Sequence, residues 1–445
     1  MLCQEVLSLS NVKVGVGRKC ITPPMGTAMS GYFRPRFSSG VLDDIYVTAV
    51  AFDDGKNRAM IISLDLCGLK NQEYQDKYKR MVSESCGISF DAIITNCSHT
   101  HTGPIVGYDK SSETESNPIY DELLGEYIRD AAVMACNDLK DARFFVSKGE
   151  VKNLAFVRLF RMKDGSVKTN PGCLNPDIVA PIAEPDETVR LVKITRDGGE
   201  DILITHFGVH ADTVGGEKIS ADFIGALRRS VEARRKNTLC TFLQGAEGDL
   251  NHVNVSLPRP EGDRYPRTIK MGERLADEVL KICDIGDELQ VNDIFYKTSV
   301  VTIPANKENH RLPEALRVAE LHRTGRDDEI ETNGAGVVTV VAEALRIINL
   351  ENAPDYYNFT LSAIKLGNLV FAGLPGEPFC EIGKRITSKS PYDMTLVCAL
   401  TDGGEIYFPT GNIYDEGGYE ARSTYIKKGA DDILVSNMLK LLAEL

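Results

Sequence analysis

The sequence predicts an α/β protein with mixed β-sheets flanked by helices, arranged in two lobes. The chain has 445 residues. Because single hydrophobic cores stop growing at about 250–300 residues, two closely packed lobes are expected within one unit spanning residues 1–445. Apolar strands and amphipathic helices alternate through the first third of the chain, as in an α/β layer. Histidines recur where predicted strands end, which is where α/β sheets bind ligands.

Composition and charge exclude several classes of partner. Hydrophobic residues make up 42% of the chain, charged residues make up 26%, and the net charge is −13. With a pI near 5.2, the protein has no basic field to attract nucleic acid or an anionic membrane. We therefore expect a small-molecule substrate, no nucleic-acid partner and no stable membrane association, and a homo-oligomer is compatible with this composition.

The N-terminus and the cysteines favour a cytoplasmic location. The first residues lack the basic and apolar pattern of a signal peptide, and no stretch approaches the ~18 uninterrupted apolar residues of a membrane span. The 11 cysteines include no Cys-x-x-Cys pair, and most lie in apolar runs. We expect reduced thiols in the core of a cytoplasmic protein.

Local patterns predict the order of elements. Alternating apolar residues predict a strand over 12–18, and the Asp-Asp-Gly-Lys turn at 53–56 predicts a hairpin between the runs 46–52 and 57–66. A helical period over 71–86 ends at Gly87, and a second helix begins at Asn117-Pro118. Further strands are expected at 92–97, 143–147, 155–162, 188–195, 201–206, 239–243 and 359–371, and further helices at 221–235, 266–283, 313–323 and 379–388.

Two kinds of segment carry more specific expectations. Residues 105–116 and the Pro- and Asn-rich residues 166–187 are expected to form long loops that shape a site. The arginine pairs at 228–229 and 234–235 are expected on the solvated face of a helix.

The histidines are distributed unevenly. Five of the seven lie on or just after the ends of predicted strands, in glycine-containing loops: His99, His101, His206, His210 and His252. In extended backbone, residues i and i+2 project to the same side, so His99 and His101 are expected to face one cavity. The alternative is that these are hydrogen-bonded loop histidines, and His206, within a strand, also fits a satisfied core residue.

His99, His210 and one carboxylate would form a zinc site of the three-ligand catalytic type, which leaves a position open for water. Many carboxylates are candidates, and Glu377 is favoured because the prolines on either side fix a turn just past a strand. Its alternative role is to stabilise the N-terminus of the following helix. Zinc with an open position activates water and polarises a carbonyl, which predicts hydrolysis of an amide or ester.

These residues also carry a resemblance to the catalytic domain of neutral (neutral/alkaline, non-lysosomal) ceramidases. The most specific matches are Ser-His-Thr-His-Thr-Gly-Pro at 98–104 and Leu-Pro-Gly-Glu at 374–377. Residues 153–179 resemble more closely a branch of uncharacterised bacterial ceramidase-like proteins. Other matching segments follow in the same order at 14–17, 21–23, 31–32, 153–158, 209–211, 245–249, 418–420 and 423–424.

The resemblance implies a ceramidase-like fold and a zinc amidase in which His99, His210 and Glu377 match metal ligands. It implies that His101 lies behind the ligands or contacts the substrate, and that Arg158 lies near the reacting carbonyl. We expect His101 to hand on protons or hold the substrate. Arg158 also fits a simple ion pair with one of the many carboxylates.

Other candidate site residues come from the matching loops. Asp249 and Asn251 are candidate catalytic residues, although Gly-rich loops favour Asp and Asn for turn formation alone. His252, Tyr407 and Tyr419 are candidate substrate contacts.

The chain departs from the family pattern at the reaction centre. Ceramidases carry Gly-Asp-Val-Ser-Pro where this chain has Gly-Asp-Leu-Asn-His at 248–252, so the serine hydroxyl is missing and Asn251 is left as an oxyanion donor. Gly404 stands where a metal-bound tyrosine is expected, three residues before Tyr407. The fourth ligand is therefore Asp402, Glu405 or water.

The chain ends at Leu445, without the C-terminal immunoglobulin-like domain of full ceramidases. A soluble, non-ceramide substrate is therefore expected for a zinc-dependent hydrolase. Two alternatives stay open: a metal-dependent lyase or isomerase of a polar metabolite or sugar acid, and a ligand-binding homologue without activity.

Overall fold

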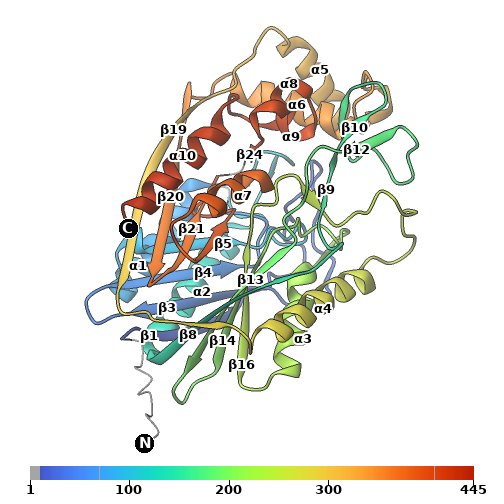
Figure 1. The fold of residues 1–445 in the computed structure, drawn as a ribbon. Coiled ribbons are helices and arrows are strands. Elements are labelled where there is room, and N and C mark those ends of the chain that lie inside the picture. The colour runs from blue at the N-terminus through green and yellow to red at the C-terminus, as the bar shows by residue number, and fades with distance from the viewer. Residues whose placement is uncertain (1–10, 70, 405) are drawn as a thin grey trace, which may run out of the picture.

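Two β-sheets form the framework of the computed structural model, which describes residues 11–69, 71–404 and 406–445. The larger sheet runs in the order β16-β14-β13-β8-β1-β3-β4-β5, with β18 paired to β8, and the smaller runs β19-β20-β21-β23 (Figure 1). The strands of the larger sheet are β1 (Lys13–Cys20), β3 (Tyr46–Asp53), β4 (Arg58–Leu64), β5 (Ile93–Cys97), β8 (Lys140–Glu150), β13 (Thr188–Arg196), β14 (Asp201–Phe207), β16 (Thr238–Gln244) and β18 (Asp287–Leu289). Those of the smaller sheet are β19 (Ile294–Pro304), β20 (Tyr356–Leu366), β21 (Leu369–Gly373) and β23 (Met394–Cys398).

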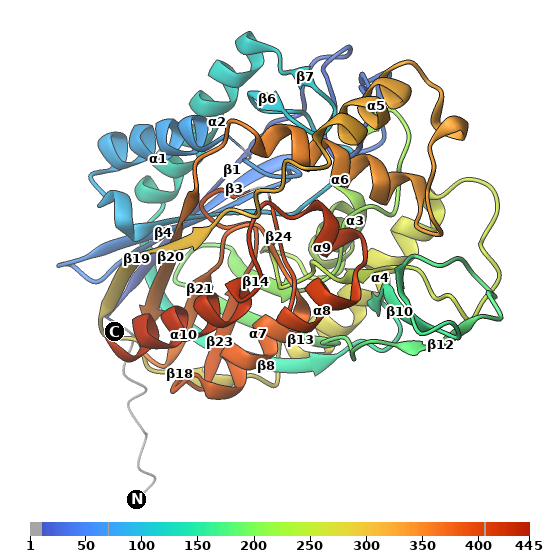
Figure 2. The same cartoon turned by 90° about the horizontal axis from the view of Figure 1, so that it is seen from above.

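Helices cover the outer faces of both sheets, giving four layers in the order helix, sheet, sheet, helix (Figure 2). The helices α1 (Gln72–Cys86) and α2 (Pro118–Asn137), with α3 (Asp222–Arg234) and α4 (Tyr265–Ile282), lie on the larger sheet. The smaller sheet is covered by α7 (Cys380–Lys389) and α10 (Ala430–Ala443). The predicted mixed α/β class is confirmed.

Short elements complete the chain. The helices are α5 (Leu312–Arg323), α6 (Val337–Leu350), α8 (Gly411–Glu416) and α9 (Tyr419–Ser423), with the 3₁₀ turns η1 (Phe90–Ala92) and η2 (Asp327–Glu329). The strands are β2 (Gly40–Val41), β6 (Tyr108–Asp109), β7 (Thr114–Glu115), β9 (Phe156–Val157), β10 (Leu159–Met162), β11 (Val167–Thr169), β12 (Ile178–Pro181), β15 (Lys218–Ile219), β17 (Leu250–Asn251), β22 (Glu377–Pro378) and β24 (Tyr407–Phe408).

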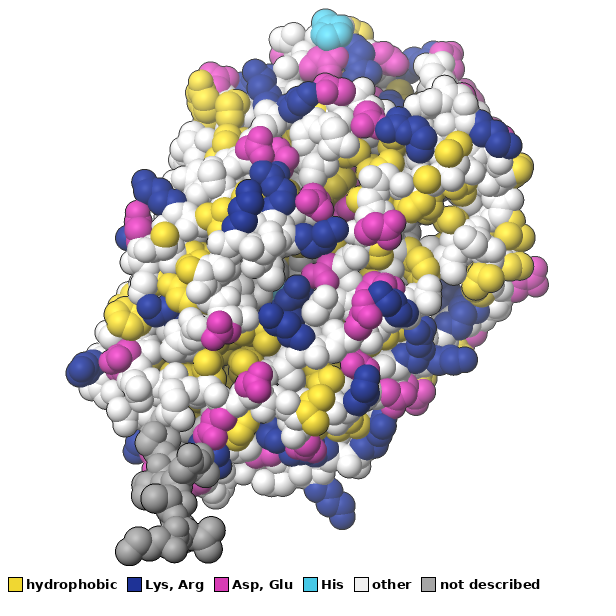
Figure 3. Space-filling model, in the orientation of Figure 1, with side chains coloured by type: hydrophobic (Ala, Val, Ile, Leu, Met, Phe, Trp, Pro, Cys, Tyr) yellow, Lys and Arg dark blue, Asp and Glu magenta, His cyan; other side chains and the backbone are white. Residues whose placement is uncertain are grey.

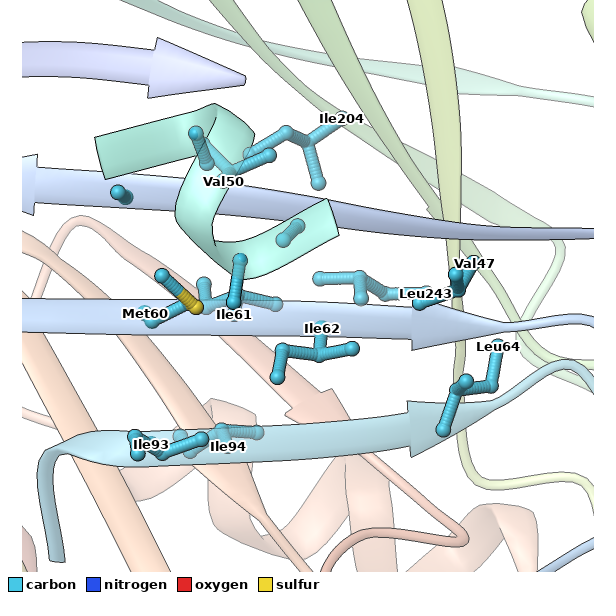
Figure 4. Packing of buried hydrophobic residues seen from close by; sticks show 14 of the residues in the cluster. Val47, Val50, Met60, Ile61, Ile62, Leu64, Ile93, Ile94, Ile204 and Leu243 are labelled. Carbon is cyan, nitrogen blue, oxygen red and sulfur yellow. The ribbon is translucent and has the colours of Figure 1, made fainter. Parts of the chain in front are cut away.

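The core between the two sheets follows the two-residue period of the strands. On β21, Leu369 and Phe371 face the larger sheet, whereas Val370 and Ala372 join the core beneath α7 and α10. Phe371 meets Phe52 of β3 with ring centroids 6.5 Å apart. Figure 4 shows the dense packing of Ile, Val and Leu side chains around β3, β4 and β5. Because this core is shared, the two sheets hold each other in place.

Turn and cap residues act as the sequence predicts. β3 and β4 form an antiparallel hairpin, and the Asp53 side chain accepts a hydrogen bond from the Gly55 amide at 2.7 Å. α1 ends at Gly87, whose φ of 63° suits glycine. The Asn117 side chain caps α2 by accepting from the Ile119 amide. These local predictions are confirmed.

Two expectations about segments differ from the structure. Residues 166–187 contain β11 and β12, which pair with both edges of β10, so this segment is partly a small sheet. The patterns also predict no element over residues 337–350, where α6 forms. Its β-branched run disfavours a helix locally, but packing against α5 and α9 overrides that preference.

The position of the Arg228 side chain also differs from the prediction. The side chain was expected in solvent, but Arg228 is buried and donates from both terminal nitrogens to Asp65, at 2.8 Å from Nη1 to Oδ1. Asp65 also accepts from the Tyr46 amide at 2.8 Å. This pair ties α3 to the ends of β3 and β4. Arg234, in contrast, lies at the surface and pairs with Asp277.

The described surface mixes both signs of charge. On the face shown in Figure 3, basic and acidic side chains are interspersed. Within residues 11–69, 71–404 and 406–445, no helix has the length and apolar character to cross a bilayer.

We predict that Asp65→Ala lowers the free energy of unfolding by about 3–5 kcal/mol, because it leaves the Arg228 guanidinium buried without its partner. Denaturant unfolding measures this loss. The matched control is Asp277→Ala, which breaks the exposed pair with Arg234 and should cost less than about 1 kcal/mol. Equal effects of the two substitutions would show that burial of the Arg228 pair does not matter.

Candidate metal centre

Three segments bring potential ligands together where the two sheets meet. His99 follows β5, His210 follows β14, and Glu377 opens β22 just after β21 of the smaller sheet. Each of these strands has a parallel neighbour, and the segments after it leave the same edge of its sheet. β5 is joined to the chain after β23 by the amide of Cys97, which donates to the Leu400 carbonyl. The larger sheet thus supplies two histidines and the smaller sheet the carboxylate.

The donor atoms of these three residues face one another. Oε2 of Glu377 lies 3.4 Å from Nε2 of His99 and 3.1 Å from Nε2 of His210. One ligand atom of each residue lies within 4.8 Å of those of the other two, and all three residues are buried. Bonds of ~2.1 Å in a tetrahedral zinc site place ligand atoms roughly 3.4 Å apart. The spacing therefore suits zinc.

The hydrogen bonds of the rings leave the facing atoms as electron-pair donors. Nδ1 of His99 lies 2.7 Å from the Cys67 carbonyl oxygen, and Nδ1 of His210 lies 3.0 Å from that of Glu247. A carbonyl only accepts, so each Nδ1 carries a proton, and Nε2 of each neutral ring is the atom that can bind a metal. Burial lowers the pKa of His99, but the Glu377 carboxylate raises it well above its usual value, so without a metal the His99 ring carries the positive charge beside Glu377. A metal ion would take the place of that proton, and the donor set fits a metal ion.

A second group of potential ligands overlaps this one. Cys67, His99 and His101 also lie within reach of a common ion. In this group the Cys67 sulfur lies 3.7 Å from Nδ1 of His99, the nitrogen that already faces a carbonyl. The set of His99, His210 and Glu377 is therefore the stronger candidate.

The electrostatics favour a positive charge at this point. Burial raises the pKa of Glu377, but the neighbouring histidines outweigh that effect and hold it well below its usual range, so the carboxylate is ionised. Burial, aided by Arg158, lowers the pKa of His210 to about 4, so this ring is neutral near pH 7. A buried carboxylate beside a neutral imidazole is the environment in which a divalent cation is bound.

His101 lies at the centre as expected, but the backbone before it does not have the extended conformation that the sequence predicted. His99 has a left-handed φ of 65°, so the segment is not the extended backbone from which a shared face was inferred. The rings nevertheless meet, with Nε2 of His101 3.2 Å from Nε2 of His99. Gly31 makes room, because a Cβ there would lie 2.7 Å from the His101 ring. Nδ1 of His101 lies 4.0 Å from the Asp212 carboxylate.

Arg158 points into the same space. Its Nη1 lies 3.3 Å from Nε2 of His210, while Nε donates to Glu420 at 2.6 Å and Nη2 to the Gly248 carbonyl at 2.7 Å. The Glu420 side chain is fully buried and also accepts from Thr169. This fixed arginine presents one N–H group to the centre.

Two tyrosines flank Arg158. Tyr407 pairs with Glu377 across β22 and β24, and its hydroxyl lies 3.4 Å from Nε2 of His210. Tyr419 packs edge-on against Tyr407 at 5.5 Å. Burial raises the pKa of Tyr407 well above its usual value, so its hydroxyl stays protonated.

A cavity of about 110 Å³ opens onto the centre. His99, His101 and Glu377 line it. Its other walls combine the polar residues Lys110, Ser111 and Ser423 with apolar and aromatic ones, which include Phe33, Leu69, Ala342, Leu345, Ile406, Tyr407, Tyr419 and Tyr425. Ala342 and Leu345 belong to α6, so the helix that the sequence did not predict forms part of the cavity wall.

The remaining candidate residues lie beside the centre with other partners. Asp249 accepts from the Cys380 amide, the first residue of α7, at 2.7 Å. Asn251 donates to the Asn170 side chain at 2.8 Å and accepts from the Val253 amide. His206 is a buried core residue that donates to the Val397 carbonyl. The catalytic roles of Asp249 and Asn251 stay predictions, as does the contact of His252 with a substrate.

The structure argues against Asp402 as a fourth metal ligand. Asp402 is buried in a ring of donors formed by Lys79, Thr95 and Ser362, with its Oδ1 3.2 Å from the Lys79 ammonium. Both carboxylate oxygens of Asp402 are therefore occupied by hydrogen bonds and an ion pair at the junction of the two sheets. Glu405 lies outside the described residues. Gly404 lines the cavity with a φ of 83°, which disfavours a side chain there.

Two buried carboxylates were missed as site residues. Glu420 was noted only within a matching segment, and its role as the partner of Arg158 depends on the fold. Both oxygens of Glu247 are buried without hydrogen bonds, and burial raises its pKa well above the usual value. The sequence signals for Glu247 are its place in the matching segment 245–249 and in the Gly-rich loop after β16.

The chain is an α/β protein in which two packed sheets hold a buried cluster of two histidines and one carboxylate between them. This cluster is a candidate metal site. No protein-family model matches the sequence. The fold is similar to that of neutral ceramidase from Pseudomonas aeruginosa, with a TM-score of 0.74 and 18% identity over 98% of this chain and 75% of that one. A second structure, a ceramidase complexed with C2, gives a TM-score of 0.71 and 16% identity over 98% and 76%. The predicted ceramidase-like fold is confirmed.

We predict about one zinc per chain in protein purified without a metal-binding tag, and loss of that zinc in His99→Ala and Glu377→Ala. Each substitution removes one of the three candidate ligands that the described residues supply. Elemental analysis after dialysis measures the stoichiometry. His310→Ala, which removes a histidine that is exposed and distant in sequence, and Glu381→Ala should keep the metal. A wild-type protein without metal after zinc is supplied would contradict the assignment.

Asp249 provides a test by pH. Burial raises its pKa to about 6, so the folded protein binds this proton more tightly than the unfolded chain, and ionisation destabilises the fold. Relative to Asp249→Asn, the wild-type free energy of unfolding should fall by about 2–3 kcal/mol between about pH 4 and about pH 7, and then level off. Denaturant titrations across this range measure it. A difference independent of pH would show that the carboxyl is not held in this way.

Proposed function

We propose that this protein is a zinc-dependent hydrolase that cleaves an amide bond, or less readily an ester bond, in a small soluble substrate. The observation that carries the proposal is the convergence of three candidate ligand atoms, from His99, His210 and Glu377, beside a cavity that His99 and Glu377 line. The ceramidase-like fold supports the choice of an amide.

Zinc held by these three residues would supply Lewis acidity toward a carbonyl and lower the pKa of water. The protein groups around it suit the charge changes of amide hydrolysis. Arg158 and the Tyr407 hydroxyl direct hydrogen-bond donors at the space where negative charge develops on the carbonyl oxygen. Glu420 and the Gly248 carbonyl hold Arg158 in that orientation.

His101 is the proposed acid–base group. It lies beside His99 at the edge of the cavity, where it can take a proton from water and give it to the departing amine. In this reaction the water oxygen joins the carbonyl carbon, the C–N bond breaks, and the amine leaves with the proton. The Asp212 carboxylate lies 4.0 Å from Nδ1 of His101, on the side of the ring away from His99 Nε2.

The cavity accepts a small part of the substrate. It has a volume of about 110 Å³ and is partly open to solvent. We propose that a short acyl group or a small ring enters it, while the rest of the substrate extends outside. The ten described cysteines are all free thiols, which supports the proposed cytoplasmic location.

We predict that a panel of short N-acyl compounds will include substrates whose hydrolysis stops after chelation and returns with zinc. In isotope-labelled water, mass spectrometry should find the label in the released acid. Glu377→Gln should lower kcat/KM at least about a hundredfold, and Glu381→Gln should leave it unchanged. Products without the label would favour the lyase or isomerase alternative and contradict hydrolysis.

A further inference from the structure

Two arginines beside the centre lack acidic partners. Neither Arg264 nor Arg267 is within 4.0 Å of any carboxylate of a described residue, although α3 arginines such as Arg229 and Arg234 each pair with one. Among the described residues, Arg267 donates to the Glu261 carbonyl alone, and the Arg264 side chain donates to none. In a chain with a net charge of −13, two adjacent cations without an ion pair are unusual.

Arg264 and Arg267 lie at the start of a helix, where a bound anion would be favourable. Arg264 is the N-cap residue of α4, and Arg267 lies in its first turn, which contains no acidic residue. The N-terminus of a helix carries a partial positive charge, and cations there are unfavourable. Asp263, the nearest acid in sequence, accepts from the Tyr265 amide instead of pairing with Arg264. A bound anion would meet two guanidinium groups and the positive end of an 18-residue helix.

His252 adds an independent observation. The residue is partly exposed, but Nδ1 of its ring is buried and has no hydrogen-bond partner among the described residues. Burial and the charges of Arg264 and Arg267 lower its pKa to about 4. A buried imidazole nitrogen without a partner, beside two unpaired guanidinium groups, is a polar position that a ligand can complete.

This cationic cluster, Arg264, Arg267 and His252, lies next to the catalytic cavity. A Cβ on Gly215 would lie 3.0 Å from Nη1 of Arg264 and 3.6 Å from the Tyr32 hydroxyl. Tyr32 lines the cavity and donates to Asp212, whose carboxylate lies near His101. Arg36 stacks on Tyr32 at 4.0 Å and is already used by the carbonyls of Ser30 and His101. Arg264 thus lies near enough to the Asp212 carboxylate to lower its pKa, but it forms no ion pair with a described residue on this side of the centre.

We propose that the substrate carries an anionic group, a carboxylate or a phosphate, that binds to Arg264 and Arg267 with His252 beside it. This inference rests on the proposed amide hydrolysis and names the class of substrate. The scissile amide lies at the centre, a small acyl group or ring occupies the cavity, and the anionic group extends toward α4. The planar guanidinium of Arg264 makes paired hydrogen bonds to such an oxyanion.

The binding test is independent of catalysis. Sodium sulfate is titrated calorimetrically into the zinc-loaded protein at constant ionic strength. The wild type and Arg274→Gln should bind one sulfate, because Arg274 lies further along α4 and contacts only backbone carbonyls. Arg264→Gln and Arg267→Gln should bind it at least tenfold more weakly, and Arg264→Lys should recover part of the loss. No sulfate site, or a site unaffected by Arg264→Gln, would overturn the proposal.

The kinetic test separates this inference from the proposed function. Matched pairs of N-acyl amino acids and their neutral carboxamides are compared by kcat/KM. The wild type should prefer the carboxylate at least tenfold, and Arg264→Gln should lose that preference through KM while keeping its activity on the carboxamide. Hydrolysis without a preference overturns the anion site and leaves the hydrolase standing. Arginine-dependent sulfate binding without hydrolysis of any amide leaves the anion site and overturns the hydrolase.

Discussion

The central constraint on this structure is the meeting of three electron-pair donors in a buried place. Oε2 of Glu377 lies 3.4 Å from Nε2 of His99 and 3.1 Å from Nε2 of His210, and all three residues are buried. Burying an ionised carboxylate without compensation is costly. Glu377 therefore needs a positive charge beside it, which the protonated His99 ring or a bound cation can supply.

The fold supports this centre by fixing backbones closely. His99 sits in a left-handed conformation, and strain of this kind persists only when surrounding structure enforces it. Its amide donates to the Leu66 carbonyl, which helps to hold that conformation. Gly248 lets the loop after β16 pack on the Glu377 backbone, since a Cβ there would lie 2.4 Å from the Glu377 carbonyl oxygen. Ligand positions therefore depend on contacts between segments from both sheets.

Buried polar pairs then join the layers around the centre. Lys79 from α1 meets Asp402, which also accepts from the Thr95 amide of β5, so one carboxylate links a helix and both sheets. Arg158 and Glu420 form a similar link between β9 and α9, and Arg158 reaches the centre. Such pairs add little net stability but favour one arrangement over others. In this protein, that arrangement directs an N–H group of Arg158 toward the candidate metal centre.

Local chemistry in the sequence determined the α/β class, most strand and helix positions, the hairpin at 53–56 and the caps at Asn117 and Gly87. It also singled out His99, His210 and Glu377, because histidines after strands and a carboxylate between prolines are unusual patterns that a short segment can display. What only the tertiary structure decided depends on contacts between distant segments. The burial of Arg228 against Asp65, the helical state of 337–350, the pairing of Arg158 with Glu420 and the isolation of Arg264 have no local pattern. Their energies come from neighbours that folding alone brings together.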